Sequence, residues 1–247
     1  MIRHFIIMSS SYSSKTRIAM DYVLDGKVRA DMLLHEIETI RKQCGESVSI
    51  STHFVLSESR EWCSVVQADP FFAGVHLVQT LGEFVGLILE DRNLTGVDVA
   101  HYILSFRKCT HLLLEKLAYL CYAEYLCKTG KKLFDDKIYA FSYGPVVKSI
   151  YDKYKGNREE IEEEIQDTIA YMPIQSRLLF AEDGIGKIRV IKDTLEMFKD
   201  YTASKLVDLT HTVGGPWDSV DKNGYYIEIP DEVILKRHHI EMKTCMS

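Results

Sequence analysis

Residues 110–128 read THLLLEKLAYLCYAEYLCK and predict a long helix. Apolar and aromatic side chains occupy nearly every direction around it, and its few polar residues are Glu115, Lys116, Glu124 and Lys128. A helix that is apolar on almost all sides is usually the central helix of a bundle. Gly130 is expected to end it. If the ammonium group of Lys116 is buried there, it requires a carboxylate or several carbonyl groups as partners.

The segments around this helix predict a mainly helical domain. Tyr143-Gly144-Pro145 predicts a turn that starts a helix at Val146, with Pro145 at the first helical position. Residues 177–180 and 187–191 flank the turn-forming stretch EDGIG, which predicts a β-hairpin. Further helices are predicted over residues 97–106, 195–201, 203–209 and 231–239.

A strongly acidic stretch, REEIEEEIQD, occupies residues 158–167. It predicts a helix with a solvated charged face and with Ile161 and Ile165 pointing inward. The alternative interpretation is an acidic surface for a basic partner. The solvated face is the favoured one, because runs of charge usually serve solubility.

The first 93 residues alternate strand and helix patterns. Strands are predicted over residues 5–8, 47–55 and 75–78, and helices over residues 17–24, 32–43, 57–67 and 80–89. The polar stretch 90–93 has no periodicity and marks a boundary. We therefore predict an α+β protein. A small α/β domain of about three strands spans residues 1–93, and a mainly α-helical domain with one β-hairpin spans residues 94–247.

Composition excludes several classes of protein. The 247 residues carry 30 Lys and Arg against 36 Asp and Glu, a net charge of −6, which makes direct nucleic-acid binding unlikely. No apolar run approaches the length of a membrane span. The start, MIRHFIIMSSS, lacks a signal-peptide pattern, and the six cysteines form no CxxC pair. We expect reduced thiols in a cytoplasmic protein.

No motif for catalysis, metal or cofactor binding is present, so we expect no enzyme activity, no metal and no cofactor. Phosphate-loop, zinc-protease and nucleophile-elbow patterns are absent. Asp135 and Asp136 are expected to cap the segment that begins at Lys137. A minor alternative is a small-ligand sensor or enzyme in the N-terminal domain, in which the turn at residues 9–14 and the predicted helix after it hold an anion. A plain turn and cap is favoured there.

Large aromatic residues gather at the breaks in the helical part. Tyr119, Tyr122 and Tyr125 lie on the central helix, Phe141 and Tyr143 precede Gly144-Pro145, and Trp217 follows Gly215-Pro216. Tyrosine and tryptophan are common at protein interfaces. They are also ordinary core residues with a polar tip, and this interpretation is favoured on physical grounds alone.

Ordered motifs over about residues 94–240 resemble the Panacea family, also called SocA-like or GepA-like domains. The matching segments are DVAHYIL (98–104), LEKLAY (114–119), TGKKLFDD (129–136), AFSYGPVV (140–147), ASKL (203–206), LTH (209–211) and GPW (215–217). Glu115 replaces the usual Gln before the lysine, and Tyr125 stands where Trp is common. The predicted hairpin around Gly184 is an addition, and the first 93 residues lie outside the resemblance.

The resemblance implies a mainly helical, non-enzymatic antitoxin that binds and neutralises a toxin protein encoded beside it, on a bacterial chromosome, a prophage or another mobile element. It also implies, as an alternative, an adaptor that delivers the bound protein to a protease. The resemblance implies no association with a membrane, and it does not indicate the oligomeric state. Its motif positions are candidate partner-binding or fold-determining residues: Lys116, Tyr119, Tyr122, Phe141, Tyr143, Gly144, Pro145, His211, Pro216 and Trp217.

Overall fold

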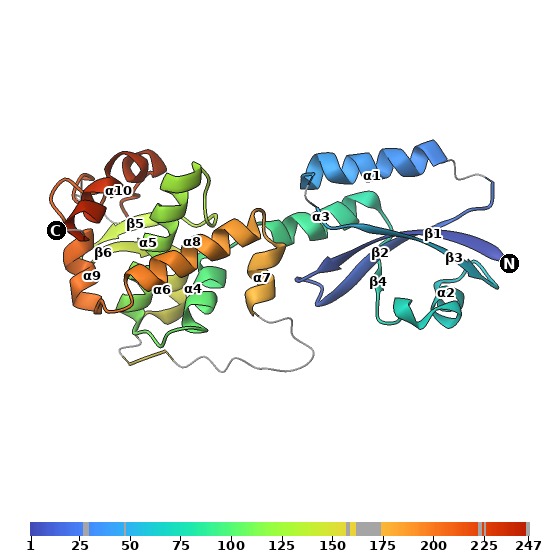
Figure 1. The fold of residues 1–247 in the computed structure, drawn as a ribbon, viewed down its shortest axis with the longest axis horizontal. Coiled ribbons are helices and arrows are strands. Elements are labelled where there is room, and N and C mark those ends of the chain that lie inside the picture. The colour runs from blue at the N-terminus through green and yellow to red at the C-terminus, as the bar shows by residue number, and fades with distance from the viewer. Residues whose placement is uncertain are drawn as a thin grey trace. The chain divides into compact units, whose positions relative to one another are not determined.

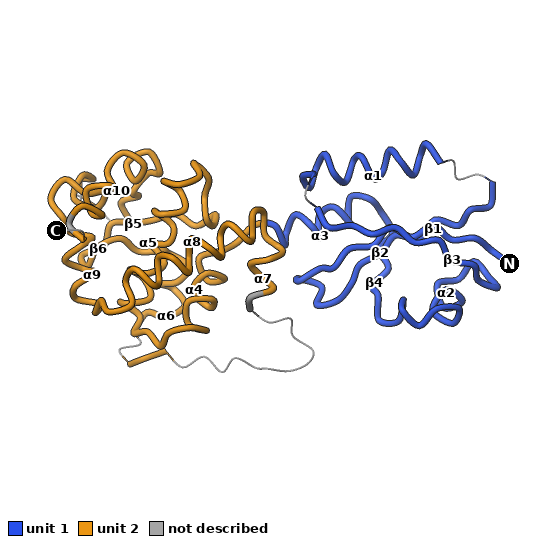
Figure 2. The backbone as a smooth tube through the Cα atoms, viewed as in Figure 1, with its two compact units in different colours: residues 1–92, 170–172 blue, residues 93–169, 173–247 orange. Residues whose placement is uncertain are grey.

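The fold was analysed in a computed structural model that describes residues 1–26, 30–46, 48–156, 159–161, 174–221, 224 and 226–245. The fold is α+β, as predicted. The described chain divides into two compact units, of which one comprises residues 1–92 and the other begins at Asn93 (Figure 2). None of the described helices is both long and apolar enough to cross a membrane.

The first unit is built on a four-stranded sheet in the order β3-β1-β2-β4 (Figure 1). Strand β1 (Ile2–Ser11) pairs antiparallel with β2 (Thr16–Val23) and with β3 (Ser51–Ser57), whereas β4 (His76–Leu77) is parallel to β2. The prediction of a helix over residues 17–24 is therefore wrong. Ile18, Met20 and Tyr22 alternate along β2 toward one apolar core, and eight residues are too few to separate this period from a helical one.

Helices cover both faces of this sheet (Figure 1). Helices α1 (Ala30–Cys44) and α3 (Leu81–Arg92) bury apolar side chains against one face, which also receives Phe5 and Ile7 from β1. Helix α2 (Trp62–Ala68) and a 3₁₀ turn (Pro70–Phe72) pack on the opposite face, against Ile6 and Met8. Alternate residues of β1 thus enter two separate cores, as the period of two in a strand requires.

The second unit is organised around α5 (His111–Thr129), which is buried on every side from Leu113 to Leu126. The prediction of a central helix ended by Gly130 is confirmed, since Gly130 adopts the left-handed conformation with φ 70°. The surrounding helices are α4 (Gly96–Leu104), α6 (Lys148–Tyr154), α7 (Ile174–Phe180), α8 (Gly184–Met197), α9 (Ala203–Thr210) and α10 (Asp231–Cys245).

The β-hairpin of this unit lies elsewhere than predicted. Residues 177–180 belong to α7 and residues 184–191 to α8, and Asp183, with φ 53°, forms the left-handed step before α8. The hairpin is instead β5 (Ile138–Phe141) with β6 (Gly144–Val147), so Pro145 lies in a strand and does not start a helix. Pro145 is tolerated there because β6 lies at the edge of a two-stranded sheet.

Of two further predictions for this unit, one differs from the structure and the other falls mostly outside the described residues. The carboxylate of Asp136 does not cap the segment at Lys137; its Oδ2 accepts the backbone N–H of Gly96, at the start of α4, at 2.6 Å. Most of the predicted acidic helix over residues 158–167 lies outside the described residues. Within it, Ile161 is buried and donates its backbone N–H to the carbonyl of Cys109 at 2.8 Å.

Candidate functional site

Three residues of the family-like motifs converge on the backbone of the β5–β6 hairpin. Lys116 Nζ on α5 donates to the carbonyl oxygen of Pro145 at 2.6 Å. The indole Nε1 of Trp217 donates to the carbonyl oxygen of Phe141 at 2.8 Å. Nε2 of His211, at the end of α9, lies 3.3 Å from the carbonyl oxygen of Ser142. These three contacts join residues that are 29, 69 and 76 positions apart in the sequence, so separate motifs together fix one turn.

The ammonium group of Lys116 is fully buried beneath the hairpin. Burial lowers its pKa to about 8, although the neighbouring carboxylate of Glu115 opposes this shift. Glu115 contacts the same strand differently, because its Oε2 accepts the backbone N–H of Val147 at 2.8 Å. The two adjacent residues of α5 thus bind a carbonyl and an N–H of β6.

Gly144 is required by the geometry of this turn. Its φ of 102° is in the region that favours glycine, and a Cβ atom there would lie 2.8 Å from Thr210 Oγ1 and 3.2 Å from Lys116 Nζ. Thr210 is itself buried, and its hydroxyl donates to the carbonyl of Leu206 in α9. The hairpin backbone therefore approaches α5 and α9 at a distance that only glycine permits.

His211 and Trp217 form an aromatic pair beside the turn. Their ring centroids are 3.7 Å apart at an interplanar angle of 60°. Nδ1 of His211 lies 2.6 Å from the carbonyl oxygen of Val207, so its two ring nitrogens face carbonyl oxygens of α9 and of the hairpin. Pro216, between the two, is buried. The pair thus joins the end of α9 to the hairpin.

The tip of the hairpin carries an exposed aromatic residue. Tyr143 is 68% exposed, and Val213, in the turn that follows α9, is 85% exposed. His211, close to Val213 in the sequence, contacts the carbonyl oxygen of Ser142, next to Tyr143. The two exposed side chains therefore lie on turns that contact each other. We call Tyr143 and Val213 the hairpin-tip surface. A rigid support with exposed apolar side chains is the arrangement expected of a protein-binding site.

The three tyrosines of α5 lie in the core. Two of the hydroxyls donate to carboxylates of α10, Tyr119 to Glu241 at 3.1 Å and Tyr122 to Asp231 at 2.7 Å. The third, of Tyr125, donates to Asp183 at 2.8 Å. Phe141 is half-buried and packs edge-on against Tyr151 and Tyr226. Tyr119, Tyr122 and Pro216 therefore hold the fold together and are not available to a partner in this conformation.

A buried charge network between α5 and α10 was not foreseen from the sequence. His238 Nδ1 contacts Glu241 Oε2 at 2.6 Å, and its Nε2 contacts Glu124 Oε1 at 3.3 Å. Burial opposes the charged imidazole, but the two carboxylates outweigh it and raise the pKa of His238 to about 9. The hydrogen bond from His238 is the main cause that lowers the pKa of Glu124 to about 2. The spacing of His238 and Glu241 on one helix face was the available signal.

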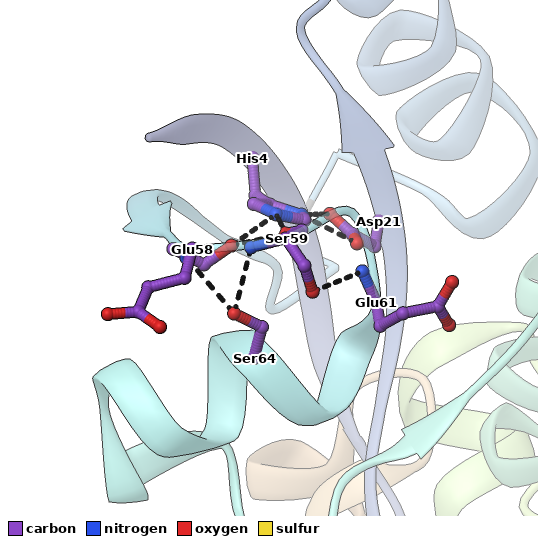
Figure 3. A network of polar contacts seen from close by, with 7 residues as sticks. His4, Asp21, Glu58, Ser59, Glu61 and Ser64 are labelled. Carbon is purple, nitrogen blue, oxygen red and sulfur yellow. Dashed lines mark hydrogen bonds and ion pairs between the residues drawn. The ribbon is translucent and has the colours of Figure 1, made fainter.

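The first unit contains a polar network around His4 that was also missed (Figure 3). His4 Nδ1 lies 2.8 Å from Asp21 Oδ2, and its Nε2 lies 2.9 Å from Ser57 Oγ. Asp21 is in β2, which the sequence pattern had assigned to a helix, so the three residues could not be brought together from the sequence. The order Asp21, His4, Ser57 resembles that of a hydrolytic triad.

The hydrogen bonds of this network favour a structural role. Ser57 Oγ donates to the carbonyl of Ser59 at 2.6 Å, so its proton is directed away from His4. The backbone N–H groups of Glu58 and Ser59 are taken by Ser64 Oγ, as Figure 3 shows. His4 and Ser57 are buried, so a substrate does not reach the hydroxyl. The network connects β1, β2 and the end of β3.

The turn over residues 9–14, proposed above as a minor anion site, is arranged differently. It joins two strands and precedes no helix. The carboxylate of Asp91 on α3 accepts the backbone N–H groups of Tyr12 and Ser13, at 2.7 and 2.9 Å. The N–H groups that would bind an anion are thus already bound. Among the described residues, no three His, Cys, Asp or Glu side chains gather in a metal-binding arrangement.

The hairpin and the three residues that contact it, Lys116, His211 and Trp217, lie within the range that matches one known family. Residues 114–218 match the family described as antitoxin SocA-like, Panacea domain. This part of the chain is similar to the SocA-like Panacea domains. The matched range includes Lys116, Gly144, His211 and Trp217.

A curated protein is also similar to this chain. Antitoxin SocA of Caulobacter vibrioides (strain NA1000 / CB15N) is 24% identical over 143 residues, which cover 53% of this chain and 73% of the relative. No solved structure matches the chain. The family match and this relative support an antitoxin-like role, and they favour a protein without enzyme activity.

Proposed function

We propose that this protein is an antitoxin that neutralises a toxin protein by binding it, and that the toxin is encoded beside it on a bacterial chromosome, a prophage or another mobile element. The hairpin-tip surface of the Panacea domain contacts the toxin. Neutralisation in this form requires a complementary surface and no chemical step. The protein acts in the cytoplasm, where it encounters the toxin.

The observation that carries this proposal is the convergence of Lys116, His211 and Trp217 on one hairpin. Their polar atoms contact backbone carbonyl groups of the turn, and the large side chain exposed at the tip is Tyr143. A fixed turn loses little conformational entropy on binding, so an aromatic residue at its tip is an efficient contact. The net charge of −6 favours encounter with a basic partner.

The test is a growth assay with the neighbouring gene. The neighbouring open reading frame is expressed alone, with the wild-type protein and with Tyr143→Ala, and the tagged protein is purified from each culture. We expect toxicity alone, rescue and a stable complex with the wild type, and lost rescue with the variant. Because Tyr143 is mostly exposed, the variant keeps the wild-type melting temperature.

Ile185→Ala is the matched control, since Ile185 is as exposed as Tyr143 but lies on α8. It should rescue growth fully. Equal loss of rescue in both variants, or full rescue by Tyr143→Ala, contradicts a contact at the hairpin tip. A toxin half-life that falls sharply when the protein is present, and recovers in a protease-deficient strain, identifies the protein as an adaptor that delivers the toxin for degradation.

A further inference from the structure

Strand β3 of the first unit has an unpaired edge. It is the outermost strand of the order β3-β1-β2-β4, and within the described residues its backbone is hydrogen-bonded to β1 alone among the strands. Its pairing with β1 runs over seven consecutive residue pairs without a bulge. The strand reads STHFVLS and contains no charged residue and no proline. Natural sheets commonly protect an exposed edge with charges, prolines or bulges, and β3 has none of these.

The exposed face of β3 is apolar. Phe54 is 75% exposed and Leu56 is 52% exposed, and both point to the same face because they are two residues apart. The opposite face is occupied within the unit, where Val55 packs against the core beneath α2 and Ser57 is buried in the His4 network. An extended chain added to this edge would therefore cover Phe54 and Leu56 while leaving the opposite face unchanged.

We infer that β3 is a self-association site, at which β3 of a second copy of this chain pairs antiparallel about Val55. In this register Val55 lies opposite Val55 of the second copy, and Phe54 lies opposite Leu56. Each protomer then places its two exposed apolar side chains against those of the other, and no like charges meet. The arrangement has two-fold symmetry, as most homodimers do, and joins two four-stranded sheets into one of eight.

The size of this contact determines its strength. Two paired strands of seven residues fall short of the roughly 20–30 residues a side that a standard stable interface contains. The dimer is accordingly weak. The inference does not depend on the proposed toxin binding, because it concerns the other unit and requires only the isolated protein.

Sedimentation equilibrium of the full chain over about 5–500 µM tests this inference. The wild type is expected to move from monomer to dimer across this range. Phe54→Lys and Leu56→Glu are each expected to remain monomeric, because each buries an unpaired charge opposite an apolar side chain. The double variant is expected to dimerise again, since residue 54 then faces residue 56 of the other copy with opposite charge.

Ile185→Lys is the control for an added charge at an exposed apolar site of the second unit, and it should dimerise as the wild type does. Circular dichroism verifies that each variant is folded, which is expected because the substituted side chains are mostly exposed. A wild type that remains monomeric at the highest concentration overturns the inference. A dimer that survives Phe54→Lys, or a double variant that stays monomeric, overturns the pairing about Val55.

Discussion

Gly144 is the residue on which the geometry of the hairpin depends most directly. Replacing it with alanine forces an unfavourable backbone conformation and places Cβ 2.8 Å from Thr210 Oγ1. We expect Gly144→Ala to destabilise the protein by about 2–4 kcal/mol. Gly130→Ala is the matched control, because Gly130 also has a positive φ but no atom lies within 4 Å of its Cβ position. Urea unfolding of both variants should show the larger loss at Gly144; equal losses would mean that the close approach is not significant.

Trp217 contributes both a hydrogen bond and apolar packing to the same hairpin. Trp217→Phe removes the bond to the carbonyl of Phe141 but keeps a ring, so we expect a loss of about 1 kcal/mol. Trp217→Ala also removes the packing against His211 and should cost about 3 kcal/mol. Thermal unfolding measures both. A wild-type melting temperature in Trp217→Ala would show that the ring does not support the fold.

Lys116 should leave a signature in the pH dependence of stability. Its pKa in the folded state is about 8, below the ordinary value of 10.5. Between these values the unfolded chain binds more protons, so the contribution of Lys116 to stability rises with pH from about 8 to 10.5. Lys116→Met lacks this rise. Urea unfolding of both proteins at pH 8 and pH 10 checks the prediction, because the contributions of the other titrating groups cancel when the two free energies of unfolding are subtracted. The same change in free energy with pH in both proteins would contradict it.

The motif residues could be recognised from the sequence, whereas their partners could not. Lys116 was expected to need several carbonyls or a carboxylate, and the structure gives it one carbonyl, that of Pro145. A pattern identifies a lysine on a buried helix face, but the acceptor is 29 residues away in a strand that had been assigned to a helix. The role of Gly144 could be recognised from the sequence, because a glycine before a proline in a turn signals an unusual backbone conformation at that residue.

At the scale of helices, the docking of α10 on α5 depends on the charge of His238. The pKa of His238 is about 9 in the folded protein against an ordinary 6.5, because Glu124 and Glu241 outweigh the effect of burial. Its stabilising contribution is complete below pH 6.5 and is lost as pH rises through about 9. His238→Gln should abolish this decline, which urea unfolding between pH 6 and pH 9.5 measures. An unchanged pH dependence in the variant would exclude His238 as its source.

Some elements were predicted wrongly because a short sequence pattern is compatible with more than one type of secondary structure. Residues 182–186 contain an Asp-Gly pair that is typical of hairpins, but Asp183 takes the left-handed conformation itself and Gly184 starts α8. The Cβ of any other residue at 184 would lie 2.2 Å from the carbonyl oxygen of Leu178, which a sequence pattern does not reveal. By contrast, α5 was predictable because nineteen residues with apolar side chains in all directions fit only a buried helix.

At the scale of the molecule, the second unit should fold without the first. Its core includes residues from α4 through α10, and the core clusters of the first unit share no residue with it. We expect residues 93–247 expressed alone to be helical and to unfold cooperatively in urea. Residues 114–218, the range of the family match, should not, because Glu241 and Asp231 on α10 are missing and leave Tyr119 and Tyr122 without acceptors. Cooperative folding of the shorter piece would contradict this.

The hydrogen bonds of the α5 tyrosines also determine when the second unit can complete its fold during synthesis. Helix α10 is translated after every other described element, yet it supplies the acceptors of two buried hydroxyls at the centre of the domain. A nascent chain that has emerged only as far as α9 therefore holds α5 with unsatisfied polar groups and an uncovered apolar surface. Such a chain should be a good substrate for cellular proteases. Premature termination would then yield fragments that are removed, and only ribosomes that pass α10 would release a lasting product.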